Sequence, residues 1–154
     1  MTIERAVLLT VWLVCLILIP ITIPRARIRE AVLVFLASQA ITWTLSILFV
    51  EMGLLENPVR EFPAATGTNF TNNYVLYPYL STIFFLYYPL GKSLLRRICS
   101  QAVHLAIACI YVYAIKTYTD IVNYLHYNMF LTGIVFFLGM NVTRWYGYWF
   151  FKKA

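Results

Sequence analysis

Five long stretches of the chain contain no Asp, Glu, Lys or Arg, and this pattern restricts the fold more than any other feature. They cover residues 6–24, 31–50, 74–91, 98–115 and 121–143. A helix needs about 20 mostly apolar residues to cross the hydrocarbon core of a bilayer. Each stretch is close to that length, so the sequence predicts one all-α domain over residues 1–154 with five transmembrane helices. The connections are short except for the segment 51–73, which we expect to be a loop.

The composition excludes the main soluble classes of protein. Hydrophobic residues make up 62% of the 154 residues and charged residues 12%, whereas soluble globular chains have about 45–50% and 25%. Disordered chains are poor in aromatic residues, which here reach 18%. The net charge of +6 comes from basic residues beside the apolar stretches, where they face lipid headgroups. We therefore expect a multi-pass protein of a cell membrane that contacts lipids and binds no nucleic acid.

The basic residues predict the orientation of the helices. Nine of the twelve fall on one side of a five-helix arrangement, and only Arg5, Arg60 and Lys116 fall on the other. Basic residues near membrane helices accumulate on the cytoplasmic side. This rule places the N-terminus outside and the C-terminus in the cytoplasm. The nine residues are Arg25, Arg27, Arg29, Lys92, Arg96, Arg97, Arg144, Lys152 and Lys153.

Polar side chains form stripes on three of the expected helices. They are Ser38, Thr42 and Ser46 with Gln39, then Ser100, Gln101, His104 and Ala108, and finally Asn128, Thr132, Gly139 and Thr143. Polar groups in hydrocarbon need partners, so we expect the three stripes to face one another inside the bundle. Gln39 and His104 lie at depths that suit a mutual hydrogen bond. Gln39, Gln101 and His104 are therefore candidate intramembrane residues, either for helix packing or for a proton or ligand site.

The segment 51–73 is the most informative part of the chain, because long ordered loops are usually functional. It carries Glu51, Glu56, Arg60 and Glu61, and we expect Asp120 and His126 from the next loop on that side to be neighbours. In one interpretation Arg60 forms an ion pair with Glu56 or Glu61 and fixes the loop. In the other, these side chains form an outward-facing polar pocket for a lipid headgroup, a small ligand or a partner protein.

No pattern in the chain predicts a cofactor or a metal. Two histidines, His104 and His126, stand 22 positions apart with no cysteine or carboxylate at ligand spacing. Cys15, Cys99 and Cys109 are an odd number without a pairing pattern, so we expect packed thiols. Nucleophile and phosphate-loop motifs are absent as well, and no catalytic residue can be assigned.

One set of motifs resembles a known family. The run Pro58-Val59-Arg60-Glu61-Phe62-Pro63, with Thr68-Asn69-Phe70, Tyr77-Pro78, Tyr88-Pro89 and Ser93-Leu94-Leu95-Arg96-Arg97, is similar to small, uncharacterised integral membrane proteins of Bacillus, Clostridium and related endospore-forming Firmicutes. The resemblance extends from about Arg29 to Lys153. It implies a bacterial inner-membrane protein without an assigned activity, with an envelope or sporulation role, and it adds Tyr77 and Tyr88 to the residues of interest.

Three functional hypotheses follow from these patterns. The first is a protein that binds a lipid, a small apolar ligand or a partner protein through the loop 51–73. The second is an integral membrane enzyme acting on a lipid or isoprenoid, with Glu51, Glu61, Asp120 and His126 as acid–base groups. The third is a small transporter or channel subunit, for which His104 is the one ionisable side chain at mid-depth.

Overall fold

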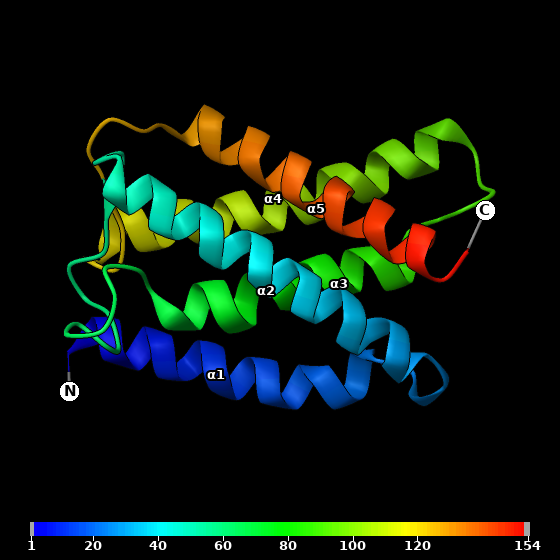
Figure 1. The fold of residues 1–154 in the computed structure, drawn as a ribbon, viewed down its shortest axis with the longest axis horizontal. Helices are drawn as coiled ribbons and strands as arrows, with labels where there is room; N and C mark the ends of the chain where they lie inside the picture. Colours follow the sequence, from blue (N-terminus) through cyan, green and yellow to red (C-terminus); the bar gives the residue numbers. More distant parts are fainter. Residues whose placement is uncertain (1, 153–154) are drawn as a thin grey trace.

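The computed structural model describes residues 2–152 and shows a bundle of five α-helices (Figure 1). This confirms the prediction of an all-α chain. The helices are α1 (Ile3–Thr22), α2 (Ile28–Glu51), α3 (Tyr77–Tyr87), α4 (Leu94–Tyr118) and α5 (Met129–Phe150). The short elements are the 3₁₀ turn η1 (Arg25–Arg27), the π-helical turn η2 (Asn72–Leu76) and the two-residue strands β1 (Leu55–Glu56) and β2 (Asn123–Tyr124).

Within residues 2–152, three segments are long and apolar enough to cross a membrane: α1, the segment from η1 through α2, and α4. The prediction of a membrane protein is supported to that extent. Together η2 and α3 cover residues 72–87, which at 1.5 Å per residue is about 24 Å, less than the roughly 30 Å of a bilayer core. Helix α5 has 22 residues, but Asn141 and Arg144 lower its hydropathy.

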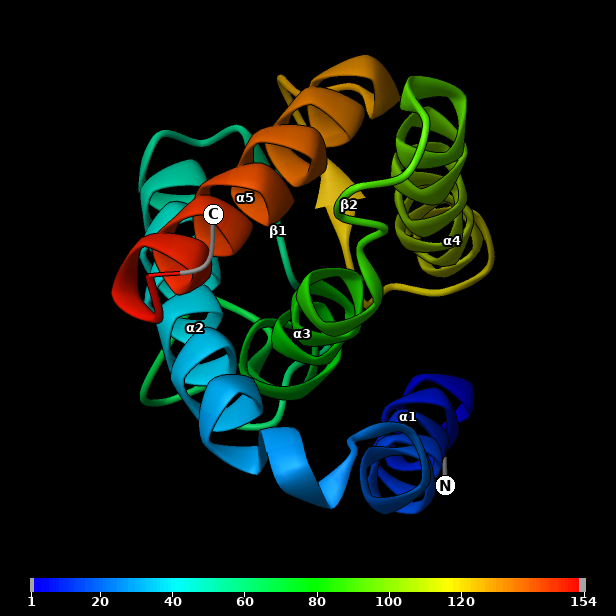
Figure 2. The same ribbon diagram turned by 90° about the vertical axis from the view of Figure 1, so that its right-hand side faces the viewer.

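The short helix α3 lies in the middle of the bundle (Figure 2). It contacts α1, α2, α4 and α5, and its Phe84 and Phe85 are almost completely buried. Helices α1, α2 and α4 instead leave rows of large apolar side chains exposed, as lipid-facing helices do. The bundle therefore shields its shortest helix, and the four longer helices leave apolar side chains exposed to the surroundings.

The two ends of the bundle differ in character. At one end lie the start of α1, the segment 52–71 and the segment 119–128 (Figure 1); we call this the loop end. There β1 pairs with β2 in antiparallel register, Leu55 opposite Tyr124 and Glu56 opposite Asn123. At the other, the basic end, lie η1, the segment 88–93 and the end of α5.

Prolines and caps move three helix ends away from the predicted bounds. Helix α1 ends at Thr22, two residues before Pro24. Helix α3 ends at Tyr87, since Tyr88 precedes a proline and takes the extended conformation that this position favours. The predicted span 121–143 is wrong at its start. The Asn128 side chain caps α5 by accepting from the Leu131 N–H at 2.9 Å, and residues 121–128 are not helical.

Candidate functional site

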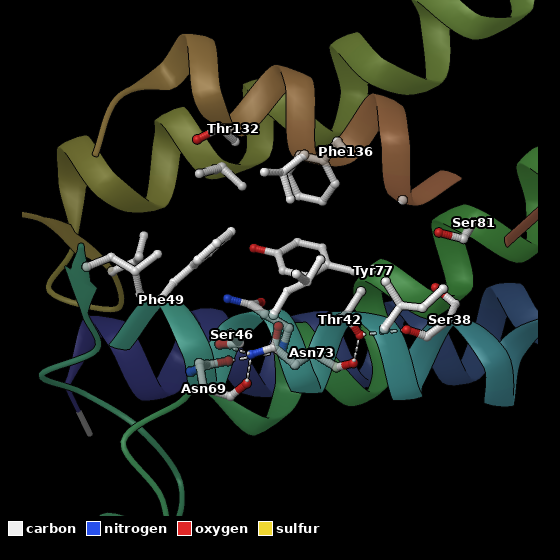
Figure 3. Close-up of a pocket in the computed structure, with 18 of the residues that line it drawn as sticks. Ser38, Thr42, Ser46, Phe49, Asn69, Asn73, Tyr77, Ser81, Thr132 and Phe136 are labelled. Atoms are coloured by element: carbon white, nitrogen blue, oxygen red, sulfur yellow. Dashed lines mark hydrogen bonds between the residues drawn. The ribbon is translucent and has the colours of Figure 1, made fainter. Parts of the chain in front are cut away.

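A cavity of about 110 Å³ lies between α2, α3 and α5 (Figure 3). One water molecule needs about 10–15 Å³ by the same measure, and an engineered cavity of about 150 Å³ takes up benzene. The cavity therefore has room for several waters or for one ring-sized organic molecule. Residues of the loop end, including Leu55, Asn57, Asn69 and Tyr124, contribute to its lining.

The lining combines a polar wall with apolar side chains. Helix α2 contributes Ser38, Thr42 and Ser46, and the segment 69–81 contributes three asparagines, Tyr77 and Ser81. Apolar side chains of both helices complete the lining. They are Ile41, Leu45 and Phe49 from α2 and Val135, Phe136 and Met140 from α5, where Thr132 and Thr143 also line the cavity. No lining residue in the described part of the chain is an acid, a base, a histidine or a cysteine. The site is thus suited to neutral molecules that have both hydrogen-bonding and apolar parts.

The irregular start of the third helix creates the polar wall. In the π-turn, the Tyr77 N–H bonds to the carbonyl of Asn72, five residues back, so the Asn73 carbonyl is not used in the regular pattern. Pro78 has no N–H to give to the Tyr74 carbonyl. Helix α2 supplies the missing donors: Thr42 Oγ1 to Asn73 O and Gln39 Nε2 to Tyr74 O, both at 2.7 Å. Two members of the polar stripe of α2 thus satisfy carbonyls that the irregular helix leaves open, as broken helices in membranes require.

Side-chain hydrogen bonds hold the asparagines of this wall in place. Asn73 Nδ2 donates to Ser46 Oγ at 3.0 Å and to the Asn69 carbonyl at 2.8 Å. Asn72 Oδ1 accepts from the Tyr111 hydroxyl at 2.7 Å, which ties the wall to α4. These contacts hold the amide groups in fixed positions, an arrangement that lowers the entropy cost of binding where a site takes up a ligand.

Among the polar groups at the cavity, the Tyr77 hydroxyl and the Asn69 amide nitrogen have no hydrogen-bond partner among residues 2–152. The Tyr77 ring packs edge-on against Phe136, with ring centroids 4.9 Å apart, and its hydroxyl points into the cavity (Figure 3). No hydrogen bond is formed by that hydroxyl within the described residues. The amide nitrogen of Asn69 is buried and also lacks an acceptor there. A buried donor without an acceptor costs about 1–3 kcal/mol, so the Asn69 amide favours an occupant that accepts hydrogen bonds, and the Tyr77 hydroxyl is free to bind one as well.

Tyr127, a tyrosine at the loop end, keeps its hydroxyl protonated over the physiological pH range. Burial, with a smaller contribution from nearby Tyr124, raises its pKa from 10.0 to about 12. The ring also contacts Phe49 of α2, at 5.3 Å between centroids. This end of the cavity therefore carries uncharged aromatic groups.

Arg60 fixes the loop, but the predicted ion pair with Glu56 or Glu61 is absent from residues 2–152. Its guanidinium instead donates to three backbone carbonyls: Thr66 and Asn57, both at 2.7 Å, and Pro63 at 3.4 Å. The one salt bridge of the described residues joins Arg27 and Glu30. Adjacent side chains in an irregular loop project in different directions, so Arg60 and Glu61 stabilise different parts of it.

Glu61 holds the start of η2 against the loop. Its carboxylate accepts from the N–H groups of Phe70 and Thr71, each at 3.0 Å, and from the Thr71 hydroxyl. The Thr71 oxygen in turn accepts from Trp12 Nε1 at 2.8 Å. One carboxylate therefore links the loop, the third helix and α1, and it is not exposed as a binding group.

The other predicted loop residues lie outside the cavity. Glu51 is exposed at the end of α2, and Glu56 is 3.5 Å from the Asn123 amide. Asp120 and His126 are brought to the loop through backbone bonds, Val59 N–H to Asp120 O and His126 N–H to Leu54 O. Within residues 2–152, no three His, Cys, Asp or Glu side chains come close enough to hold a metal ion.

The intramembrane residues are only partly arranged as expected. Stripes from α2 and α5 line the same cavity, whereas α4 contributes Val112 alone. Gln39 bonds to Tyr74, and His104 Nδ1 lies 2.8 Å from its own helix carbonyl at Ser100, so the suggested Gln39–His104 bond is not formed. Gln101 Oε1 accepts from Asn141 Nδ2 at 3.0 Å and connects α4 to α5.

Sequence reasoning identified Tyr77 but missed the asparagines at 69, 72 and 73, all of which line the cavity. Their signal was present in the sequence: three amides within five residues directly before an apolar helix are unusual near a membrane. They were assigned to the loop because the predicted helix began at residue 74.

Comparisons of the chain with protein-family models, with curated proteins and with solved structures found no match.

Proposed function

We propose that the chain is a five-pass membrane protein with its loop end outside the cell. Three helices with exposed apolar sides support the membrane setting. The clustering of basic segments at the end opposite the loops supports the orientation. In this arrangement the burial of η2 and α3 by the other helices compensates for their short length, and the aromatic end of α5 lies at the inner headgroups.

Cysteine labelling tests this topology, with Cys99 first replaced by serine because it is exposed. Ala65 and Lys92 are both exposed, at the loop end and the basic end. We expect Ala65→Cys to react with a membrane-impermeant maleimide in intact cells, and Lys92→Cys to react only after permeabilisation. Labelling of Lys92→Cys alone in intact cells would contradict the orientation. Labelling of both variants in intact cells would contradict the number of passes, because residues 65 and 92 would then lie on the same side of the membrane.

We further propose that the cavity binds a small neutral ligand. The observation that carries this proposal is its lining: uncharged polar groups lie beside apolar side chains, and the buried amide nitrogen of Asn69 has no partner in the described residues. Pockets for drug-sized molecules usually exceed about 300 Å³. The ligand is therefore a ring-sized molecule, or the hydroxyl-bearing end of a neutral lipid.

The loop 51–73 has a supporting role in this proposal. Arg60 and Glu61 are engaged in fixing it, while Asn57 and Leu55 reach the cavity. The loop thus closes the loop end of the site and does not itself form a charged pocket. The resemblance to membrane proteins of endospore-forming Firmicutes supplies the proposed setting, a bacterial cell membrane with an envelope or sporulation role.

The enzyme and transporter hypotheses have less support from the geometry. Glu51, Glu61, Asp120 and His126 all lie outside the cavity lining of the described residues, so no acid–base pair faces a bound substrate. His104, the ionisable group suggested for ion coupling, packs against Phe84 with ring centroids 5.3 Å apart and is also outside the lining.

Two glycines of α5 provide a matched test of ligand binding. Gly139 lines the cavity and Gly133 does not, and an added Cβ meets nothing within 4 Å at either position. Gly139→Leu should fill the cavity, whereas Gly133→Leu should leave it open. We expect native mass spectrometry of the protein, extracted in mild detergent from its own membrane, to show a bound mass for the wild type and for Gly133→Leu.

In Gly139→Leu the fraction carrying that mass should fall at least tenfold, because the side chain occupies the ligand's volume. Equal occupancy in the two variants would contradict the proposal, as would a wild-type protein that carries no discrete small molecule. Thermal unfolding of both variants in detergent controls for loss of the fold.

A further inference from the structure

Buried polar atoms without partners gather at a second place, away from the cavity. Five buried side-chain nitrogen or oxygen atoms of the described residues make no hydrogen bond. One is Asn69 Nδ2 at the cavity. The other four lie on the parts of α4 and α5 nearest the basic end: Arg97 Nε, Gln101 Nε2, Arg144 Nε and the Tyr148 hydroxyl.

These four groups converge because α4 and α5 run antiparallel (Figure 1). Gln101 bonds to Asn141 at 3.0 Å, and Asn141 Oδ1 accepts from Arg144 Nη2 at 2.9 Å. Arg97 is one helical turn before Gln101, and Tyr148 is one turn after Arg144. The antiparallel register therefore places both pairs at the same level along the bundle, where the Tyr148 ring packs on Phe85 of α3 with centroids 4.9 Å apart.

Neither arginine forms a salt bridge within residues 2–152, although Glu30 lies near Tyr148. Arg27 takes the salt bridge there, to Glu30 at 2.7 Å. The Arg144 guanidinium stacks on the Tyr88 ring at 3.9 Å and lies 5.9 Å from the Tyr148 ring centroid. Stacking on rings fixes the guanidinium plane and leaves its edge for an acceptor. Arg144 is therefore a fixed positive charge, and both arginines keep an Nε donor that an anion can accept from.

We propose that this site binds the phosphate of an anionic phospholipid headgroup. Guanidinium groups bind phosphate through two parallel hydrogen bonds, and the Gln101 amide and Tyr148 hydroxyl supply two more donors. Trp145 and Trp149 beside the site are 66% and 64% exposed, as expected of aromatic residues at headgroup depth. Leu94 and Leu95 are 72% and 71% exposed at the start of α4. A phosphate at this position thus comes with acyl chains beside it.

Two neighbouring arginines on α4 allow a test that distinguishes binding at this site from non-specific attraction of anionic lipids to a basic surface. Arg97 carries a buried, unpaired Nε, whereas Arg96 is exposed. Arg97→Gln and Arg96→Gln remove the same charge from adjacent positions. The measurement is native mass spectrometry after reconstitution in nanodiscs that contain equal parts of phosphatidylglycerol and phosphatidylcholine.

We expect the wild type to retain phosphatidylglycerol at least tenfold more often than phosphatidylcholine. Arg97→Gln should abolish that preference, and Arg96→Gln should keep it. Arg144→Lys, which keeps the charge but loses the planar fork, should lower the retention severalfold. Thermal unfolding of each variant in detergent shows whether the bundle remains folded, and Arg97→Gln tests the site even if Arg144 variants do not fold.

Equal effects of Arg97→Gln and Arg96→Gln would overturn the proposal, because they would show that only net charge matters. Equal retention of the two lipids by the wild type would overturn it too. Adding millimolar inorganic phosphate distinguishes the source of the anion. Unchanged lipid retention supports a headgroup site, and displacement of the lipid would show a site for free phosphate instead.

Discussion

Glu61→Ala is expected to lower the free energy of unfolding by about 2–4 kcal/mol, since hydrogen bonds to charged groups contribute about 1.5–3 kcal/mol each and buried donors would lose their acceptor. The carboxylate accepts from two backbone N–H groups and one hydroxyl, at Phe70 and Thr71. Thr71 is completely buried, so water cannot replace the lost acceptor without opening the structure. Denaturant titration in detergent micelles, followed by helical circular dichroism, measures the change.

Glu56→Ala is the control for this prediction. Glu56 is exposed and makes one long contact, 3.5 Å, with the Asn123 amide, so its removal should change the free energy of unfolding by less than about 0.5 kcal/mol. Equal effects of the two variants would mean that Glu61 does not hold the third helix in place.

Gly147→Ala is expected to destabilise the protein by about 1–3 kcal/mol, the usual cost of overpacking a core. An added Cβ would lie 2.6 Å from Phe85 Cε2 and 2.9 Å from Val34 Cγ2. Both side chains are almost fully buried, at 1% and 0% exposure, so neither can move away at low cost. Gly147 is therefore where α5 makes its close contact with α2 and α3.

Gly133→Ala on the same helix should have the opposite sign. Its Cβ meets nothing within 4 Å, and alanine in a helix is more favourable than glycine by about 0.5–1 kcal/mol. The same denaturant titration compares the two variants. A stabilising effect of Gly147→Ala would show that the three helices pack less closely than described.

Hydropathy and charge predicted the all-α class and the position of the long loop, and three of the five predicted spans are helices long and apolar enough to cross a membrane. These features follow from side-chain chemistry summed over many residues, so they do not depend on tertiary detail. The bounds of α3 and α5 do depend on it. Pro78, Pro89 and the Asn128 cap act at single positions, and an apolar window of 20 residues averages them away.

The candidate site was only partly predictable for a related reason. Hydroxyl and amide side chains at steps of four on α2 indicated an inward face, and they do line the cavity. Their partners were backbone carbonyls exposed by a π-turn, which no side-chain pattern records. The adjacent charges of Arg60 and Glu61 suggested an ion pair, whereas each binds backbone groups of a different segment.

Photocrosslinking from adjacent positions on α5 tests the ligand-binding cavity most directly. Phe136 lines the cavity, and its neighbour Phe137 is 45% exposed on the outside of the bundle. A diazirine-bearing phenylalanine at either position, irradiated in native membranes, reports what lies beside it. We predict one discrete small-molecule adduct from position 136 and a mixture of membrane phospholipids from position 137. The same phospholipid mixture from both positions, or no adduct from position 136, would contradict a dedicated ligand site.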